Sequence, residues 1–259
     1  MNDILSHIED RVLTLTFNRV AKKNALTVAM YGFLADQLEH AAADSAARVV
    51  VIQGDVTVFT AGNDIADFQK AAASGQTGAL EDRPVGRFLE QIATFPKPLV
   101  AAVCGPAVGV GATMLLHCDL VYAGDNAAFS FPFVNLGVIP EAGSTLLAPQ
   151  LFGYHRAAEI LLTGEPFMAE AALEVGFVNR VVPPTECNEI TAGQARKLAA
   201  KPLTSLIETK RLLKAGQSDA LLARIRDEGV VFNRLLQGPA SREAFAAFME
   251  KRKPDFSAC

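Results

Sequence analysis

The sequence predicts an α/β fold that ends in a region built from helices alone. Short apolar segments with strand composition alternate with amphipathic helices through the first two thirds of the chain, which is typical of the α/β class. From residue 185 onward, apolar residues recur only at helical spacing. We therefore expect a core over residues 1–195 and a helical C-terminal region over residues 196–259.

The first structural unit begins with a predicted hairpin. Residues 4–9 and 12–17 are rich in β-formers, and polar and apolar residues alternate in the second run. A helix is expected over residues 27–43, with Thr27 as its N-cap and apolar residues at helical spacing at Met30, Phe33, Leu34 and Leu38. Residues 48–53 then form a β-branched strand.

This unit recurs twice in looser form. The second pass is a helix, a strand, a helix and a strand at residues 84–94, 99–104, 112–117 and 119–123. The third pass is a strand, two helices and a strand at residues 127–130, 144–152, 156–162 and 177–182. Four helices follow, at about residues 186–200, 202–215, 219–236 and 240–250.

Composition excludes several classes of protein. The 259 residues are 50% hydrophobic, which is enough for a large buried core. The net charge of −4 argues against nucleic-acid binding. The four cysteines show no metal-ligand spacing, and no apolar run reaches the ~18 residues of a membrane span. The first residues do not resemble a signal peptide, so we expect a cytoplasmic protein.

Two glycine-bearing turns and one glutamate are the main candidates for chemistry. The turns are Phe59-Thr-Ala-Gly-Asn-Asp64 and Gly105-Pro-Ala-Val-Gly-Val-Gly111, and the glutamate is Glu141. Each turn can direct a backbone N–H toward one point, and two such donors stabilise an oxygen that becomes negative during a reaction. A carboxylate facing that point can move a proton. These parts suffice for chemistry through an enolate and require no metal.

Each motif taken alone also fits a structural role. Asp64 fits the N-cap of an ordinary helix, and Glu141 fits a first-turn carboxylate that interacts with a helix dipole. The Gly109-x-Gly111 spacing is shared with dinucleotide-binding loops. Against an NAD-dependent oxidoreductase, Met114 occupies the third glycine position, and Pro106 stands where the tight turn belongs.

Six segments together resemble one enzyme superfamily. They are Asn18-Arg with Asn24-Ala-Leu26, Phe59-Thr-Ala-Gly-Asn-Asp-Ile65, Lys97-Pro-Leu-Val-Ala-Ala-Val-Cys-Gly-Pro-Ala-Val-Gly-Val-Gly111, Cys118-Asp-Leu-Val-Tyr-Ala123, Leu136-Gly-Val-Ile-Pro-Glu-Ala-Gly143 and Phe248-Met-Glu-Lys-Arg-Lys-Pro254. In this order, which runs nearly end to end, they resemble the crotonase (enoyl-CoA hydratase/isomerase) superfamily. The fold hosts several chemistries, so the resemblance specifies the reaction less closely than the family.

The resemblance implies a spiral of ββα repeats whose C-terminal helices pack into homotrimers or dimers of trimers. It implies an acyl-CoA substrate, with no cofactor beyond the coenzyme A of the substrate itself. The thioester oxygen would lie between the N–H groups of Asn63 and Val110. The implied substrate and CoA contacts are Lys22, Ala25, Leu26, Ala61, Gly62, Asp64, Ile65, Gly109 and Phe133, with Phe248 and Lys251 reaching CoA from a neighbouring subunit.

Departures from the family pattern decide the expected reaction. Family hydratases use two glutamates, and this chain has Thr113 and Phe133 at those places. Neither side chain exchanges protons at neutral pH. Glu141 instead matches the glutamate of single-base enoyl-CoA isomerases, and we expect an apolar wall that includes Phe131, Phe133 and Leu136 to raise its pKa.

The sequence therefore predicts a Δ3-to-Δ2 enoyl-CoA isomerase. The alternatives are a hydratase or another acyl-CoA enolate reaction with a different base, and a non-catalytic acyl-CoA-binding protein.

Overall fold

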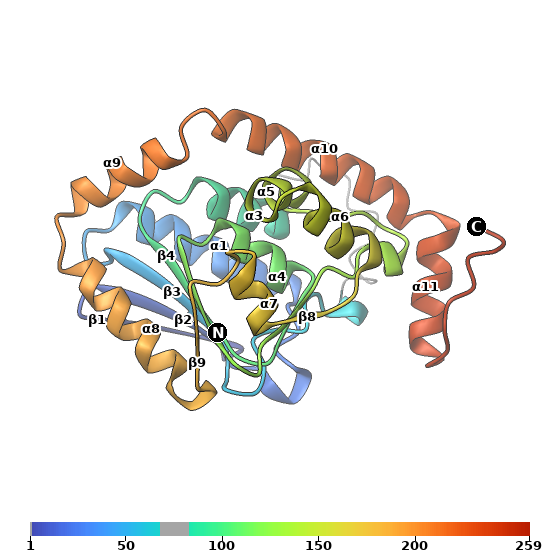
Figure 1. Cartoon of the computed structure of the whole chain (residues 1–259), viewed down its shortest axis with the longest axis horizontal. Coiled ribbons are helices and arrows are strands. Elements are labelled where there is room, and N and C mark those ends of the chain that lie inside the picture. The colour runs from blue at the N-terminus through green and yellow to red at the C-terminus, as the bar shows by residue number, and fades with distance from the viewer. Residues whose placement is uncertain (1, 68–82) are drawn as a thin grey trace.

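A six-stranded sheet forms the centre of the computed structural model, which describes residues 2–67 and 83–259. The strand order is β1–β2–β3–β4–β6–β9 (Figure 1). β1 and β2 form the predicted antiparallel hairpin, and the remaining neighbours are parallel. The strands are β1 (Ile4–Glu9), β2 (Val12–Phe17), β3 (Val49–Gln53), β4 (Leu99–Val103), β6 (Leu120–Gly124) and β9 (Arg180–Val182).

A second, three-stranded sheet lies beside the loop that follows β3. It is formed by β5 (Pro106–Val108), β7 (Ala128–Ser130) and β8 (Phe167–Met168) in that order. An isolated parallel bridge between Thr60 and Ala107 joins the segment after β3 to β5. This bridge aligns the two glycine-bearing turns of the sequence.

The large sheet is buried on both faces because alternate strand residues enter two separate cores. Val50 and Ile52 of β3 point into the main core. Val49 and Val51 point the other way and pack with α8 (Pro184–Ala199). Because successive strand residues face opposite sides, a continuous apolar run such as β3 fits a sheet covered on both faces.

The main core is covered by helices from both halves of the chain. α1 (Val28–Ala43) packs against α3 (Pro84–Thr94). α9 (Leu203–Leu213) and α10 (Ser218–Leu236) run as an arc along one side of the molecule, and α10 contacts α3 and α5 (Ser144–Phe152) (Figure 1). α11 (Pro239–Met249) lies at the end of this arc near the C-terminus. None of the described helices is long and apolar enough to cross a membrane.

The structure confirms the α/β class and most predicted elements, with differences in the second and third repeats. The helix predicted over residues 112–117 begins earlier, as α4 (Val110–Thr113), and continues as a 3-10 helix over Met114–His117. The strand predicted over residues 177–182 is only β9. α6 spans Tyr154–Thr163, and the short helix α7 (Ala169–Glu174) was not predicted.

Candidate active site

The two glycine-bearing turns lie directly against each other. A Cβ atom on Gly62 would lie 2.6 Å from the Val108 carbonyl oxygen, and one on Gly111 would lie 2.4 Å from Cγ2 of Thr60. The backbone is joined here as well, since Thr60 N–H donates to Pro106 O and Val108 N–H donates to Thr60 O, both at 3.0 Å. Glycine at residues 62 and 111 therefore permits this close approach.

The N–H groups of Asn63 and Val110 are left unpaired by this arrangement. Leu26 bridges to the segment in parallel: its N–H donates to Gly62 O at 2.8 Å, and its carbonyl accepts from Asp64 N–H at 2.9 Å. Asn63 lies between these two bonds and faces away from Leu26. Val110 is the first residue of α4, where N–H groups have no intrahelical acceptor. Within the described chain, neither N–H donates a hydrogen bond.

Gly109 holds the second turn in a conformation that other residues avoid. Its φ of 58° and ψ of −120° lie in a region open essentially to glycine alone. Its own N–H donates to Ser130 O at 3.0 Å, which fixes the turn to β7. A Cβ on Gly109 would lie 3.9 Å from Cζ of Phe133, so the Phe133 ring lies over this turn.

Glu141 lies within hydrogen-bonding distance of α4. The Thr113 hydroxyl donates to Glu141 Oε1 at 2.5 Å, and Thr113 is one helical turn after Val110. Burial raises the pKa of Glu141 to about 7, the hydrogen bond from Thr113 opposes that rise, and the charge of Glu228 adds to it. A carboxyl group with this pKa is suited to take up and return a proton near neutral pH.

Tyr31 binds the first turn and lies near enough to Glu141 to be affected by its charge. Its hydroxyl donates to Oδ1 of Asn63 at 2.5 Å, and Tyr31 is almost fully buried on α1. Burial raises the Tyr31 pKa well above its usual value, and the nearby charge of Glu141 raises it further. One hydrogen bond thus joins Glu141 to Thr113, which shares α4 with Val110, and another joins Tyr31 to Asn63.

The remaining predicted contacts fall into two groups. Leu26, Ala61, Gly62, Asp64 and Ile65 lie along the first turn, where Asp64 is paired with Arg19 at 2.9 Å and accepts the Asp67 N–H as an N-cap. Arg19 also donates to the carbonyl of Ala25. Lys22, Phe248 and Lys251 are exposed; Phe248 lies in the last turn of α11, and Lys251 follows that helix.

Phe131 is buried, but its described ring contacts are with Phe167 and Phe177. The described residues include no group of His, Cys, Asp and Glu arranged to hold a metal ion.

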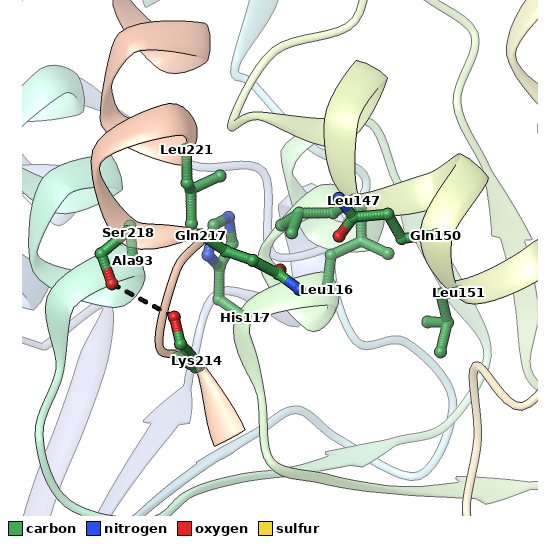
Figure 2. Close-up of a pocket in the computed structure, with 10 residues that line it drawn as sticks. All are labelled: Ala93, Leu116, His117, Leu147, Gln150, Leu151, Lys214, Gln217, Ser218 and Leu221. Carbon is green, nitrogen blue, oxygen red and sulfur yellow. Dashed lines mark hydrogen bonds between the residues drawn. The ribbon is translucent and has the colours of Figure 1, made fainter. Parts of the chain in front are cut away.

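A separate pocket of about 260 Å³ lies between the 3-10 helix Met114–His117, α5 and the start of α10 (Figure 2). Leu116, His117, Leu147, Lys214 and Leu221 are among its lining residues, and none of the predicted site residues lines it. Nε2 of His117 is 2.8 Å from the Ala142 carbonyl oxygen, and burial lowers the His117 pKa to about 3. The neutral imidazole therefore donates to the turn from behind.

Three residues of this arrangement were not among the sequence candidates. Tyr31 lies beside an apolar helix face and is buried. Because a buried tyrosine hydroxyl needs a hydrogen-bond partner, its place in the sequence could have indicated a polar contact. Thr113 was noted only as a substitution for a family glutamate. Glu228 shares the face of α10 with Leu221 and Ile225, and a carboxylate in such an apolar stripe indicates a specific buried partner.

Comparisons with known proteins show the family of the chain. The family model described as enoyl-CoA hydratase/isomerase matches residues 7–258. The chain is 36% identical over 257 residues to the 2,3-dehydroadipyl-CoA hydratase of Escherichia coli, covering 99% of both chains. It is 35% identical over 226 residues to the enoyl-CoA delta isomerase 2 of Rattus norvegicus, covering 87% of this chain and 58% of that one.

A solved structure leads to the same family. The crystal structure of an enoyl-CoA hydratase/isomerase from Pseudoalteromonas atlantica superposes with a TM-score of 0.92 at 38% identity, covering 98% of this chain and 100% of that chain. These similarities extend along nearly the whole sequence. The chain belongs to the enoyl-CoA hydratase/isomerase family, within the crotonase superfamily.

Proposed function

We propose that this acyl-CoA enzyme moves the double bond of a 3-enoyl-CoA into conjugation with the thioester, giving the 2-enoyl-CoA. The observation that carries the proposal is the hydrogen bond from Thr113 to Glu141 at 2.5 Å. At the first position where hydratases of the superfamily place a glutamate, this chain has a hydroxyl that holds Glu141 instead. Glu141 is thus the carboxylate available for proton transfer.

The mechanism uses the two turns and one base. The thioester oxygen accepts hydrogen bonds from the N–H groups of Asn63 and Val110. Glu141 takes a proton from C2, and the electron pair of that C–H bond moves toward the thioester, giving a dienolate whose oxygen the two donors stabilise. Protonated Glu141 then delivers the proton to C4, and the double bond comes to rest between C2 and C3. Loss of one such donor typically costs about 3–4 kcal/mol of transition-state stabilisation.

The surroundings of Glu141 disfavour addition of water. Phe133 lies over the Gly109 turn where a second proton-transfer group would stand in a hydratase. Glu228 is the described carboxylate whose charge acts on Glu141, and its oxygens are engaged by Gly143 and Thr145. A single accessible carboxylate is enough to move one proton between two carbons. Hydration is less favoured because it needs one group to activate the water and another to protonate the adjacent carbon.

The CoA contacts and the assembly belong to this proposal. CoA would follow the first turn from Lys22 past Ala61 and Ile65, and the exposed Phe248 and Lys251 would contact CoA from a neighbouring subunit. Several large apolar side chains are exposed on α6 and α11, including Tyr154, Leu162, Phe248 and Met249. We propose that such surfaces are covered in a homotrimer or a dimer of trimers, in the cytoplasm.

Hydration is the second candidate reaction, because several of the relatives are named as hydratases or probable hydratases. Both reactions can be followed by the ultraviolet absorbance of the conjugated thioester. A medium-chain 3-enoyl-CoA should give rising absorbance with the native protein and almost none with Glu141→Gln, which should still bind CoA. Falling absorbance from a 2-enoyl-CoA would indicate a hydratase. Binding without either change, across a panel of acyl chains, would indicate an acyl-CoA-binding protein.

A further inference from the structure

A second, buried carboxylate holds the start of the helix that follows Glu141. Glu228 of α10 is only 3% exposed. Its Oε2 accepts the Gly143 N–H at 2.6 Å, and its Oε1 accepts the Thr145 N–H at 3.0 Å and the Thr145 hydroxyl at 2.6 Å. These groups lie at the N-terminus of α5, where Gly143 has no side chain with which to cap the helix. Glu228 therefore supplies the cap from a different helix.

The turn between Glu141 and α5 needs such support because its backbone is strained. Ala142 and Gly143 both have positive φ values, 62° and 69°. The left-handed conformation is unfavourable for alanine, so surrounding contacts must hold it. α10 contacts the turn closely, since a Cβ on Gly143 would lie 2.3 Å from Cδ1 of Leu221. His117, at the end of the 3-10 helix Met114–His117, donates to the Ala142 carbonyl.

We propose that Glu228 is a positioning residue for the general base: its carboxylate fixes the Gly143–Thr145 backbone, holds the Glu141 carboxylate against Thr113, and places a negative charge behind it. This inference rests on the proposed function for its kinetic consequence. The effect of Glu228 on the position and pKa of Glu141 does not depend on which reaction the protein catalyses. Glu228 does not itself carry the proton, because both of its oxygens are occupied by donors.

The charged and titratable groups around this network define its electrostatics. Arg224 on α10 donates from Nη1 to the Thr145 hydroxyl at 3.0 Å, so that hydroxyl donates its own proton to Glu228. His117 behind the turn is neutral, and Tyr31 faces Glu141 from α1. Burial raises the pKa of Glu228, while its bonds to Thr145 and Gly143 and the nearby Arg224 oppose the rise. The Glu228 charge in turn raises the pKa of Glu141.

The test is Glu228→Gln, which keeps the shape of the side chain but removes its charge and one acceptor oxygen. An amide nitrogen cannot accept the hydrogen bond that one carboxylate oxygen accepts, so the turn should loosen. We expect kcat to fall about tenfold to a hundredfold, because displacement of a reacting group by about 1 Å has effects of that size. KM should change by less than about twofold, because Glu228 is buried and its oxygens bind Gly143 and Thr145. Asp227→Asn is the matched control, since it makes the same charge change on the exposed face of α10.

A second readout does not depend on turnover. The carboxyl stretching band of Glu141, obtained from infrared spectra of proteins with and without Glu141→Gln, gives its titration midpoint without substrate. Loss of the Glu228 charge lowers that midpoint and loosening of the Thr113 bond raises it, so Glu228→Gln should displace the midpoint from its native position, and Asp227→Asn should leave it in place. An unchanged midpoint together with an unchanged kcat would overturn the inference, as would equal effects of the two variants.

The two readouts also separate this inference from the proposed function. A native protein that gives no isomerisation but shows the shifted midpoint refutes the reaction and supports the role of Glu228. Native turnover with an unchanged midpoint and kcat in Glu228→Gln refutes only the role of Glu228. Should Glu228→Gln fail to fold, Thr145→Val decides the matter: it removes one donor to Glu228 and should lower kcat several-fold at constant KM, and unchanged kcat would refute the inference.

Discussion

Replacing Thr113 with valine tests how the base is held and tuned. Valine has nearly the same shape but cannot donate to Glu141 Oε1. A hydrogen bond to a charged group contributes about 1.5–3 kcal/mol, and one pKa unit corresponds to about 1.4 kcal/mol, so the Glu141 pKa should rise by about one to two units. Starting from a pKa of about 7, the ionised fraction at neutral pH should fall from about one half to about one tenth or less. Activity at that pH should therefore fall about fivefold to fiftyfold.

The assay is the pH dependence of kcat/KM for the 3-enoyl-CoA, read from the absorbance of the conjugated product. In the native protein the acidic limb should fall at about pH 7, because Glu141 must be ionised to act as the base. In Thr113→Val the limb should move to higher pH, and much of the activity should return under alkaline conditions. Thr113→Ser keeps the hydroxyl and should behave like the native protein. An acidic limb that stays in place in Thr113→Val would refute the reasoning.

Three further changes test the other parts of the site. The pKa of Glu141 is raised on folding from 4.5 to about 7, so its stabilising effect is present below pH 4.5 and is lost as pH rises through 7. Urea titrations give the free energy of unfolding of Glu141→Gln relative to the native protein. This difference should favour the variant by about 2–3 kcal/mol more at pH 8 than at pH 5. The same difference at both pH values would contradict this.

Tyr31→Phe, which loses the bond to Asn63, should lower kcat about threefold to tenfold in steady-state kinetics; an unchanged kcat would exclude that role. Gly109→Ala should lower both Tm and kcat because of its backbone angles, whereas Gly32→Ala inside α1, where the Cβ meets only ordinary contacts, should not.

Elements with strong periodicity were predictable from the sequence, and very short elements that depend on distant contacts were not. α5 has the predicted bounds, and α8 to α11 lie within a few residues of theirs. β8 has two residues and exists through its pairing with β7, which a local pattern does not show. α7 is a six-residue helix in which only Ala169 and Ala172 are buried. Its apolar face is therefore too small to show in the sequence.

The parts of the candidate site that could be predicted from the sequence are the two glycine-bearing turns and the carboxylate Glu141. The structure brings the turns of Asn63 and Val110 together and places Glu141 one hydrogen bond from α4, an arrangement that supports the proposed roles. Tyr31 and Glu228 were missed because each lies on a helix that reads as ordinary core. Their polar atoms acquire partners from segments 32 and 85 residues away in the sequence. Such distant contacts appear only in the folded chain.

The central claim is that one carboxylate moves a proton within the acyl chain and no water is added. The most direct measurement is to incubate the protein with a medium-chain 3-enoyl-CoA in water labelled with heavy oxygen and to analyse the acyl-CoA products by mass spectrometry. We expect a conjugated 2-enoyl-CoA with the same mass as the substrate and no heavy oxygen in the acyl chain. A product that carries heavy oxygen on the acyl chain would show hydration and would contradict the single-base isomerase.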